Sequence, residues 1–271
     1  MHLTVRHTTR YTFAEPPVHG LQRLRLIPKS TQGQEIVEWT MRYENAAQEL
    51  QYEDQHSNTV TLISVAPDAC HVSVECIGKV DTNDNAGVIG RHAGHLPLWS
   101  FLSQTRLTRP GARLRSFVED IDRAGGDKLD FLHRLSAAIR DEVRYTIGST
   151  GVSTTAEEAV ELGCGVCQDH AHIFIGAARD ADIPARYVSG YLMMNDRVDQ
   201  DATHAWAEAH IEGLGWVGFD ISNGISPDPR YIRVATGRDY RDAAPVTGMS
   251  LGGQTEGMSV DVAVEQQTSQ Q

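Results

Sequence analysis

Alternation of apolar and polar residues over the first eighty residues constrains the fold of this chain more than any other feature. The alternation runs from Leu3 to Thr8, and four later runs repeat it, at residues 21–27, 36–43, 59–65 and 70–80. Side chains along a β-strand point to opposite faces in turn, so this pattern predicts half-buried strands. Turn-forming pairs such as Pro16-Pro17 separate the runs. Several short strands at this spacing predict an antiparallel β-sandwich.

The pattern changes at residues 81–87, where the sequence Asp-Thr-Asn-Asp-Asn-Ala-Gly is polar and rich in turn formers. We interpret this segment as a linker. Beyond it, apolar residues recur at three- and four-residue steps from Leu129 to Ile139, which predicts an amphipathic helix. Thr154-Thr155 followed by Glu157-Glu158 predicts another helix start, for a helix near 155–162.

These patterns predict an α+β chain in three parts. We expect an N-terminal antiparallel β-sandwich over residues 1–85 and a core over residues 86–235, in which a helix packs on an antiparallel sheet. A C-terminal extension would cover residues 236–271. The extension is rich in turn formers, but an alternating run at Met258–Val264 predicts one strand that returns to a sheet.

Composition and charge argue against several classes of protein. The chain has 271 residues, of which 40% are hydrophobic and 22% charged, as is typical of soluble globular proteins. Its formal net charge of −12 argues against nucleic acid or an anionic membrane as the main partner. No apolar run approaches the roughly 20 residues of a membrane span, and Met1–His7 lack the apolar core of a signal peptide. We therefore expect a cytoplasmic protein whose four cysteines need not form disulfides.

The stretch Gly163–His170, with the sequence Gly-Cys-Gly-Val-Cys-Gln-Asp-His, indicates a chemical function. A glycine-rich turn ends in Cys167, and a helix-like run follows at once, from His170 to Ala181, and stops before Pro184. Cys167 would then lie at a helix N-terminus. Unpaired backbone N–H groups and the helix dipole favour a thiolate over a thiol there. This setting is typical of a nucleophile.

His204 and Asp220 lie on two predicted strands, at residues 203–211 and 216–221. A three-residue loop, Glu212–Leu214, would set a register in which both side chains lie on one face as diagonal neighbours. Their backbones would be roughly 7–8 Å apart, a gap that an imidazole and a carboxylate can close. A longer loop would spoil this register.

Cysteine, histidine and aspartate form the set that covalent acyl transfer needs. A free thiol near neutral pH is only a few per cent ionised, so His204 would accept the proton of Cys167. Asp220 would hold one ring nitrogen and support the imidazolium. The backbone N–H of Cys167 would donate to the oxyanion that forms on attack. Gln168 is a candidate second donor, and Trp206, on the same strand face as His204, is a candidate support.

Other interpretations stay open. Cys164 and Cys167 form a C-x-x-C, which can be a redox dithiol or half of a zinc site. A redox dithiol of this type follows a strand, whereas a helix is predicted before Cys164. A zinc site needs two more ligands, and Cys70 and Cys76 alternate in phase with valines that face a core. We therefore expect no metal and no cofactor. A non-catalytic binding or assembly module on the same fold is a further alternative.

Several ordered segments resemble the bacterial transglutaminase-like proteins. In the second half of the chain these segments are Gly165–Ala171, Ala177–Arg179, Ile183–Tyr191, His204–Glu208 and Gly215–Asp220. Shorter segments extend the resemblance over nearly the whole chain: Arg6–Tyr11, Arg23–Pro28, Gly237–Tyr240 and Asp242–Gly248. The resemblance implies a papain-like α+β transglutaminase core behind the N-terminal β domain of that family.

The resemblance also implies residue roles. Cys167 would be the nucleophile, His204 the base and Asp220 the orienting residue of a cysteine peptidase or amidase that acts on a peptide or protein. Hydrolysis is the expected outcome, and transfer to an amine is the alternative. The family commonly continues its acid as Asp-Pro-Thr, where this chain has Asp220-Ile221-Ser222. The family's Asp-x-x-Gly-Asn turn is Asp-Gln-His-Ser-Asn here, at residues 54–58.

Overall fold

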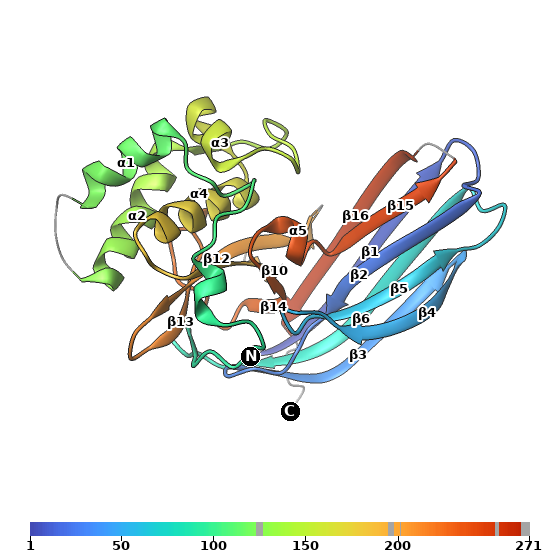
Figure 1. The fold of residues 1–271 in the computed structure, drawn as a ribbon. Coiled ribbons are helices and arrows are strands. Elements are labelled where there is room, and N and C mark those ends of the chain that lie inside the picture. Colours follow the sequence, from blue (N-terminus) through green and yellow to red (C-terminus); the bar gives the residue numbers. More distant parts are fainter. Residues whose placement is uncertain (123–126, 195–197, 201, 253–254, 267–271) are drawn as a thin grey trace.

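The structure, a computed structural model, describes residues 1–122, 127–194, 198–200, 202–252 and 255–266 (Figure 1). Its first six strands are β1 (His2–Phe13), β2 (His19–Ile27), β3 (Gln34–Glu44), β4 (Ala46–Glu53), β5 (Thr59–Val65) and β6 (His71–Thr82). The predicted runs at 21–27, 36–43 and 59–65 lie within β2, β3 and β5. The sequence did not predict β4, because nearly all its side chains are exposed and no apolar face marks it.

Two antiparallel sheets form the predicted sandwich, with strand orders β11-β16-β1-β6-β3 and β15-β2-β5-β4. The strands added to the first six are β11 (Asp199–Gln200), β15 (Val246–Leu251) and β16 (Thr255–Gln266). β16 contains the predicted return strand and pairs along the whole of β1, with Leu3 opposite Gln266. Figure 1 shows the red β16 beside the blue β1. The strands β15 and β16 therefore complete the two sheets that contain β2 and β1.

A third sheet, with strand order β14-β10-β12-β13-β7, forms the centre of the core. Its strands are β7 (Val88–Gly90), β10 (Ala185–Leu192), β12 (His204–Ile211), β13 (Gly215–Phe219) and β14 (Tyr231–Gly237). The helices are η1 (Leu98–Phe101), α1 (Ala112–Asp122), α2 (Lys128–Glu142), α3 (Ala156–Leu162), α4 (Cys167–Asp180) and α5 (Tyr240–Ala243). A short parallel pair, β8 (Arg144–Tyr145) and β9 (Cys164–Gly165), precedes α4. The predicted α+β class is confirmed.

α4 is the central helix of the core. Every residue from Asp169 to Arg179 is buried, and α4 contacts α1, α2 and α3 as well as β12. β12 faces it with Ala205, Ala207 and Ala209, which are buried and small enough to let helix and strand approach closely. The two elements that begin with Cys167 and His204 are therefore packed directly on each other.

The other predicted helices are also present. Thr155 caps α3 by accepting from the N–H of Glu158, whose carboxylate accepts from the N–H of Thr155. α2 contains the amphipathic run and buries Leu132, Leu135 and Ile139. Among the described residues, no helix is long and apolar enough to cross a membrane.

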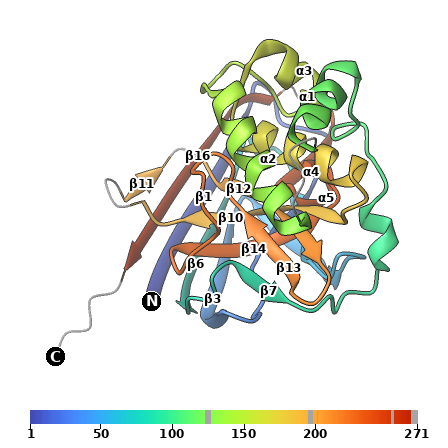
Figure 2. The same cartoon turned by 90° about the vertical axis from the view of Figure 1, so that its left-hand side faces the viewer.

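The sandwich packs directly against the core sheet. Leu3, Val5 and Val264 on the first sheet share a buried cluster with Tyr191 and Ile232 of the core. Figures 1 and 2 show that the core sheet has α1, α2, α3 and α4 on one side and the sandwich on the other. The predicted linker is consequently a short connection between two packed parts, because β6 ends where the segment begins and β7 follows it at once.

The prediction that Cys70 faces the core is wrong. Cys70 is exposed and lies just before β6, after a turn in which Asp68 has a φ of 61°. The alternation that buries Val72 and Val74 begins only beyond this turn. Cys76 lies inside the alternation and is buried as predicted, and burial raises the pKa of its thiol to about 12.

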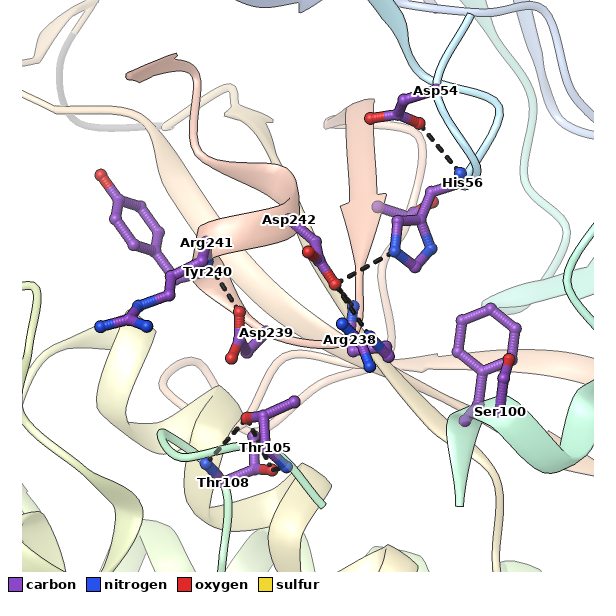
Figure 3. Close-up of polar contacts among 12 residues, drawn as sticks. Asp54, His56, Ser100, Thr105, Thr108, Arg238, Asp239, Tyr240, Arg241 and Asp242 are labelled. Atoms are coloured by element: carbon purple, nitrogen blue, oxygen red, sulfur yellow. Dashed lines mark hydrogen bonds and ion pairs between the residues drawn. The ribbon is translucent and has the colours of Figure 1, made fainter. Parts of the chain in front are cut away.

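The turn at residues 54–58 joins the sandwich to the core (Figure 3). Asp54 accepts hydrogen bonds from the backbone N–H groups of His56 at 2.9 Å and Asn58 at 3.0 Å. The His56 Nε2 atom lies 3.1 Å from the Asp242 carboxylate of α5. Ser57 stands where the family has glycine, and its φ of 61° lies in the left-handed region that favours glycine.

Candidate active site

Cys167 is the first residue of α4, as the glycine-rich turn predicted. The turn before it is held by Asp169, whose Oδ2 accepts from the backbone N–H of Val166 at 2.8 Å and from the hydroxyl of Thr150 at 2.6 Å. Gly165 is required here, because a Cβ at this position would lie 2.7 Å from the Cβ of Asp169. The half-buried Cys167 therefore begins a helix whose free N–H groups stabilise negative charge.

His204 lies between Asp220 and Cys167. Its Nε2 is 2.6 Å from Oδ2 of Asp220, and the same ring interacts electrostatically with the Cys167 side chain. Burial lowers the pKa of His204, but the Asp220 carboxylate and the contact with Cys167 outweigh burial and raise it to about 10. The imidazolium form is thus favoured over the whole neutral range.

The register of the β12–β13 hairpin brings His204 and Asp220 together. Ile211 pairs with Gly215, as the three-residue loop required, and the pairing continues to Ala207 opposite Phe219. Asp220 follows directly after β13, and its side chain is fully buried. The predicted contact between the histidine and the carboxylate is therefore present.

Asp220 has two partners that the sequence analysis missed. Oδ2 also accepts from Asn223 Nδ2 at 2.7 Å and from the Tyr231 hydroxyl at 2.6 Å. Burial raises the pKa of Asp220, but His204 and these two donors outweigh burial and hold it below its usual value. Asn223 could have been recognised from its position three residues after the acid in a turn. Tyr231 could not, because β14 was not predicted.

Trp206 and Gln168 have different positions relative to this site. The Trp206 ring stacks on His204, with ring centroids 6.1 Å apart and an interplanar angle of 29°. It also meets Tyr231 edge-on at 5.4 Å. Trp206 is 1% exposed, so its predicted role as a support of the histidine agrees with its packing. Gln168 is the second residue of α4 and half-buried, and its role as an oxyanion donor stays a prediction.

His170 explains how the chain accommodates Ser222 after the acid. Its Nε2 lies 2.9 Å from the carbonyl oxygen of Val143, so this nitrogen donates. Nδ1 must then accept, and it lies 2.9 Å from the Ser222 hydroxyl. The serine at this departure from the family pattern thus anchors the turn after Asp220 to α4.

The C-x-x-C pair is not arranged as a dithiol. Cys164 and Gly165 form β9, and Val166 is also extended. Three extended residues span about 10 Å, whereas disulfide-bonded cysteines have Cα atoms about 4.4–6.8 Å apart. In the described part of the chain, no three His, Cys, Asp or Glu side chains are grouped as metal ligands would be. The geometry does not favour the redox or the zinc interpretation.

Residues 3–81 match the bacterial transglutaminase-like N-terminal region, and residues 115–221 match the transglutaminase-like superfamily. The second match contains Cys167, His204 and Asp220. The chain combines a transglutaminase-like core with a bacterial transglutaminase-like N-terminal domain. Its N-terminal match covers the first six strands, and its core match runs from α1 to the residue after the candidate acid.

Relatives of this transglutaminase-like protein occur in mycobacteria. An uncharacterized protein of Mycobacterium leprae is 28% identical over 283 residues, which is 97% of this chain and 97% of that protein. An uncharacterized protein of Mycobacterium tuberculosis is 37% identical over 147 residues, or 51% of this chain and 46% of the relative. A solved structure of a candidate cysteine protease from Cytophaga hutchinsonii superimposes with a TM-score of 0.75 at 21% identity. The superposition covers 99% of this chain and 92% of the Cytophaga chain, and this similarity supports the fold.

Proposed function

We propose that this protein catalyses cysteine-dependent acyl transfer on amide bonds of peptides or proteins, with water as the usual acceptor. One observation carries the proposal: the His204 ring contacts the Asp220 carboxylate at 2.6 Å and interacts with the helix-start thiol of Cys167. Each group has the partner that its role in acyl transfer needs.

The chemistry follows from these contacts. The Cys167 sulfur attacks the amide carbon and forms a C–S bond, and the carbonyl electrons move to an oxyanion. The backbone N–H at the start of α4 donates to that oxygen. The His204 imidazolium gives its proton to the leaving nitrogen as the C–N bond breaks, which leaves a thioester. Water then loses a proton to His204 and attacks the thioester carbon, the C–S bond breaks, and the acid leaves with the Cys167 thiolate and the His204 imidazolium restored.

Selective alkylation provides the first test. Iodoacetamide at neutral pH should modify Cys167 faster than Cys164, which is also half-buried, because only Cys167 has an imidazolium partner. Peptide mapping by mass spectrometry would identify the modified residue. Equal, slow reaction of both thiols would instead favour the alternative of a binding module on this fold.

Substitution of each cysteine provides the second test. Cys167→Ala should abolish turnover of an amide or ester while leaving the circular dichroism spectrum unchanged. Cys164→Ala is the matched control and should retain most activity, since a thioester mechanism needs one sulfur. Equal loss of turnover in two folded variants would show that the pair acts together as a dithiol or a metal site.

A further inference from the structure

The outer edge of β14 is occupied by two side chains of the sandwich. β14 pairs with β10 on one side and is the last strand of the core sheet. On its other side, the Gln34 amide donates to the Arg233 carbonyl oxygen at 2.9 Å and accepts from the Arg233 N–H at 2.8 Å. Asn58 bonds both backbone groups of Thr236 in the same way, at 2.7 and 2.9 Å.

These two amides replace a neighbouring strand. Gln34 is 7% exposed and Asn58 is 4% exposed, so water does not compete strongly for the four hydrogen bonds. An unpaired strand edge has backbone groups that need partners. The sandwich supplies the partners at two fixed points, which fixes the position of β14 relative to the N-terminal part.

β14 in turn holds the candidate acid. Its first residue, Tyr231, donates its hydroxyl hydrogen to Asp220 at 2.6 Å. The pairing with β10 shifts between Ser189 and Gly190, and such bulges change the direction of side chains beside functional sites. Gly190 leaves room at this point, because a Cβ there would lie 2.7 Å from the Trp206 ring.

A second contact crosses from β14 to the strand of His204. Arg233 donates from Nε to the buried Glu208 at 2.8 Å, and Arg186 donates to the same carboxylate at 2.6 Å. Gln34 therefore fixes the backbone of Arg233. The side chain of Arg233 is bonded to Glu208 on β12, and Tyr231, two residues earlier on β14, is bonded to Asp220. Sandwich, β14 and acid form one continuous set of contacts.

We infer that Tyr231 is a positioning residue for Asp220, and that Gln34 makes the N-terminal sandwich part of the support of the catalytic acid. The inference rests on the proposed function, because it concerns the same cysteine, histidine and aspartate. Tyr231 would act by keeping Asp220 ionised and its Oδ2 directed at His204. Gln34 would act only through the position of β14.

The charged and titratable groups around Asp220 determine how the rate of Cys167 alkylation depends on pH. They are His204 on β12, Tyr231 on β14, His170 on α4 and Arg230 just before β14. Tyr231 is the one among them that donates to Oδ2 without changing charge in the neutral range. Its removal should therefore raise the pKa of Asp220, and the site should lose its anion at a higher pH than in the wild type.

The experiment uses the full chain and iodoacetamide as the probe, with the rate of Cys167 alkylation followed from acid to alkaline pH. Tyr231→Phe keeps the ring and loses one hydrogen bond to a charged group. The acidic limb of the profile of alkylation rate against pH should move up by about one pH unit. Alkylation is then about tenfold slower at a given pH on that limb. At alkaline pH, where a thiol ionises without an imidazolium, the two rates should converge.

A double-mutant cycle tests Gln34. Gln34→Ala should slow alkylation on the acid limb by a smaller factor, and should have no further effect in the Tyr231→Phe background, because both act through Asp220. Gln51→Ala, an exposed amide on β4, is the matched control and should leave the profile unchanged. Thermal unfolding of each variant checks that the protein is folded.

The outcomes separate the inference from the proposed function. If His204→Ala alkylates like the wild type, the ion pair is absent and the proposed function fails. If His204→Ala is slow but Tyr231→Phe keeps the wild-type profile, Tyr231 does not position the acid and the inference is overturned. Additive effects of Gln34→Ala and Tyr231→Phe would overturn the role of the sandwich.

Discussion

Replacing Asp220 by asparagine separates the charge of the acid from its shape. Oδ2 accepts from His204, Asn223 and Tyr231, at 2.6, 2.7 and 2.6 Å. Among the described residues, Oδ1 accepts a single hydrogen bond, from the backbone N–H of Asn223 at 3.2 Å. An asparagine should therefore direct its oxygen at the three donors and its NH₂ group at the weakest contact. Asp220→Asn should keep the geometry of His204 and lose the negative charge.

The expected loss in Asp220→Asn comes from the charge that is removed, and the strength of a charged hydrogen bond sets its upper limit. A hydrogen bond to a charged group contributes about 1.5–3 kcal/mol, which corresponds to roughly ten- to a hundredfold in rate. The ion pair of a cysteine enzyme can form before substrate binds, so we expect kcat to fall by about tenfold, near the lower end. Asp220→Ala also leaves three donors without their acceptor, and its kcat should fall further. His204→Ala should show the largest loss, since it removes the base itself.

The pH profile supplies a second measurement on Asp220→Asn. Asp220 helps to raise the pKa of His204 to about 10 from its usual 6.5. Without the carboxylate this pKa should fall, so the imidazolium is lost at a lower pH as the solution becomes more alkaline. The alkaline limb of kcat should move to lower pH, with KM nearly unchanged. Wild-type kcat and an unmoved alkaline limb in both Asp220 variants would show that another residue orients His204.

Two further substitutions test the structural supports of the site. Glu208→Ala leaves the buried Arg186 and the half-buried Arg233 without their shared carboxylate and should lower the free energy of unfolding by about 3–5 kcal/mol in urea titrations. A cost below 1 kcal/mol would mean that the arginines find other partners. Ser57→Gly should raise this free energy by about 0.5–1 kcal/mol, because relief of the left-handed backbone exceeds the added entropy of the unfolded chain. Destabilisation would show that the serine side chain makes a contact worth more than the strain.

Local pattern was enough to predict the positions of the candidate nucleophile and the candidate base. The start of α4 at Cys167 follows from the glycine-rich turn, and the contact of His204 with Asp220 follows from strand alternation and a short loop. Both features depend on residues close together in the sequence. The predicted return strand within β16 was also marked by its own alternation.

Tyr231 and the contacts that fix β14 could not be predicted, because they depend on residues far apart in the sequence. β14 is fully or partly buried along its whole length, so its sequence shows no alternation that marks a strand. Its bulge also interrupts any simple period. The buried amides of Gln34 and Asn58 read as ordinary polar residues until β14 is beside them. Cys70 was misplaced for the opposite reason, because an alternating pattern was extended one residue beyond the strand that produces it.

The pairing of β1 with β16 has a consequence for biosynthesis. Leu3 lies opposite Gln266, so β1 leaves the ribosome long before the strand that it pairs with. At about 5–20 residues per second, translation leaves β1 without that partner for tens of seconds. The core is synthesised in between and can fold first, since its sheet is complete once β14 ends at Gly237. A nascent chain stalled before β15 would expose the unpaired edges of both β1 and β2, which makes it a natural substrate for chaperones that recognise open strands.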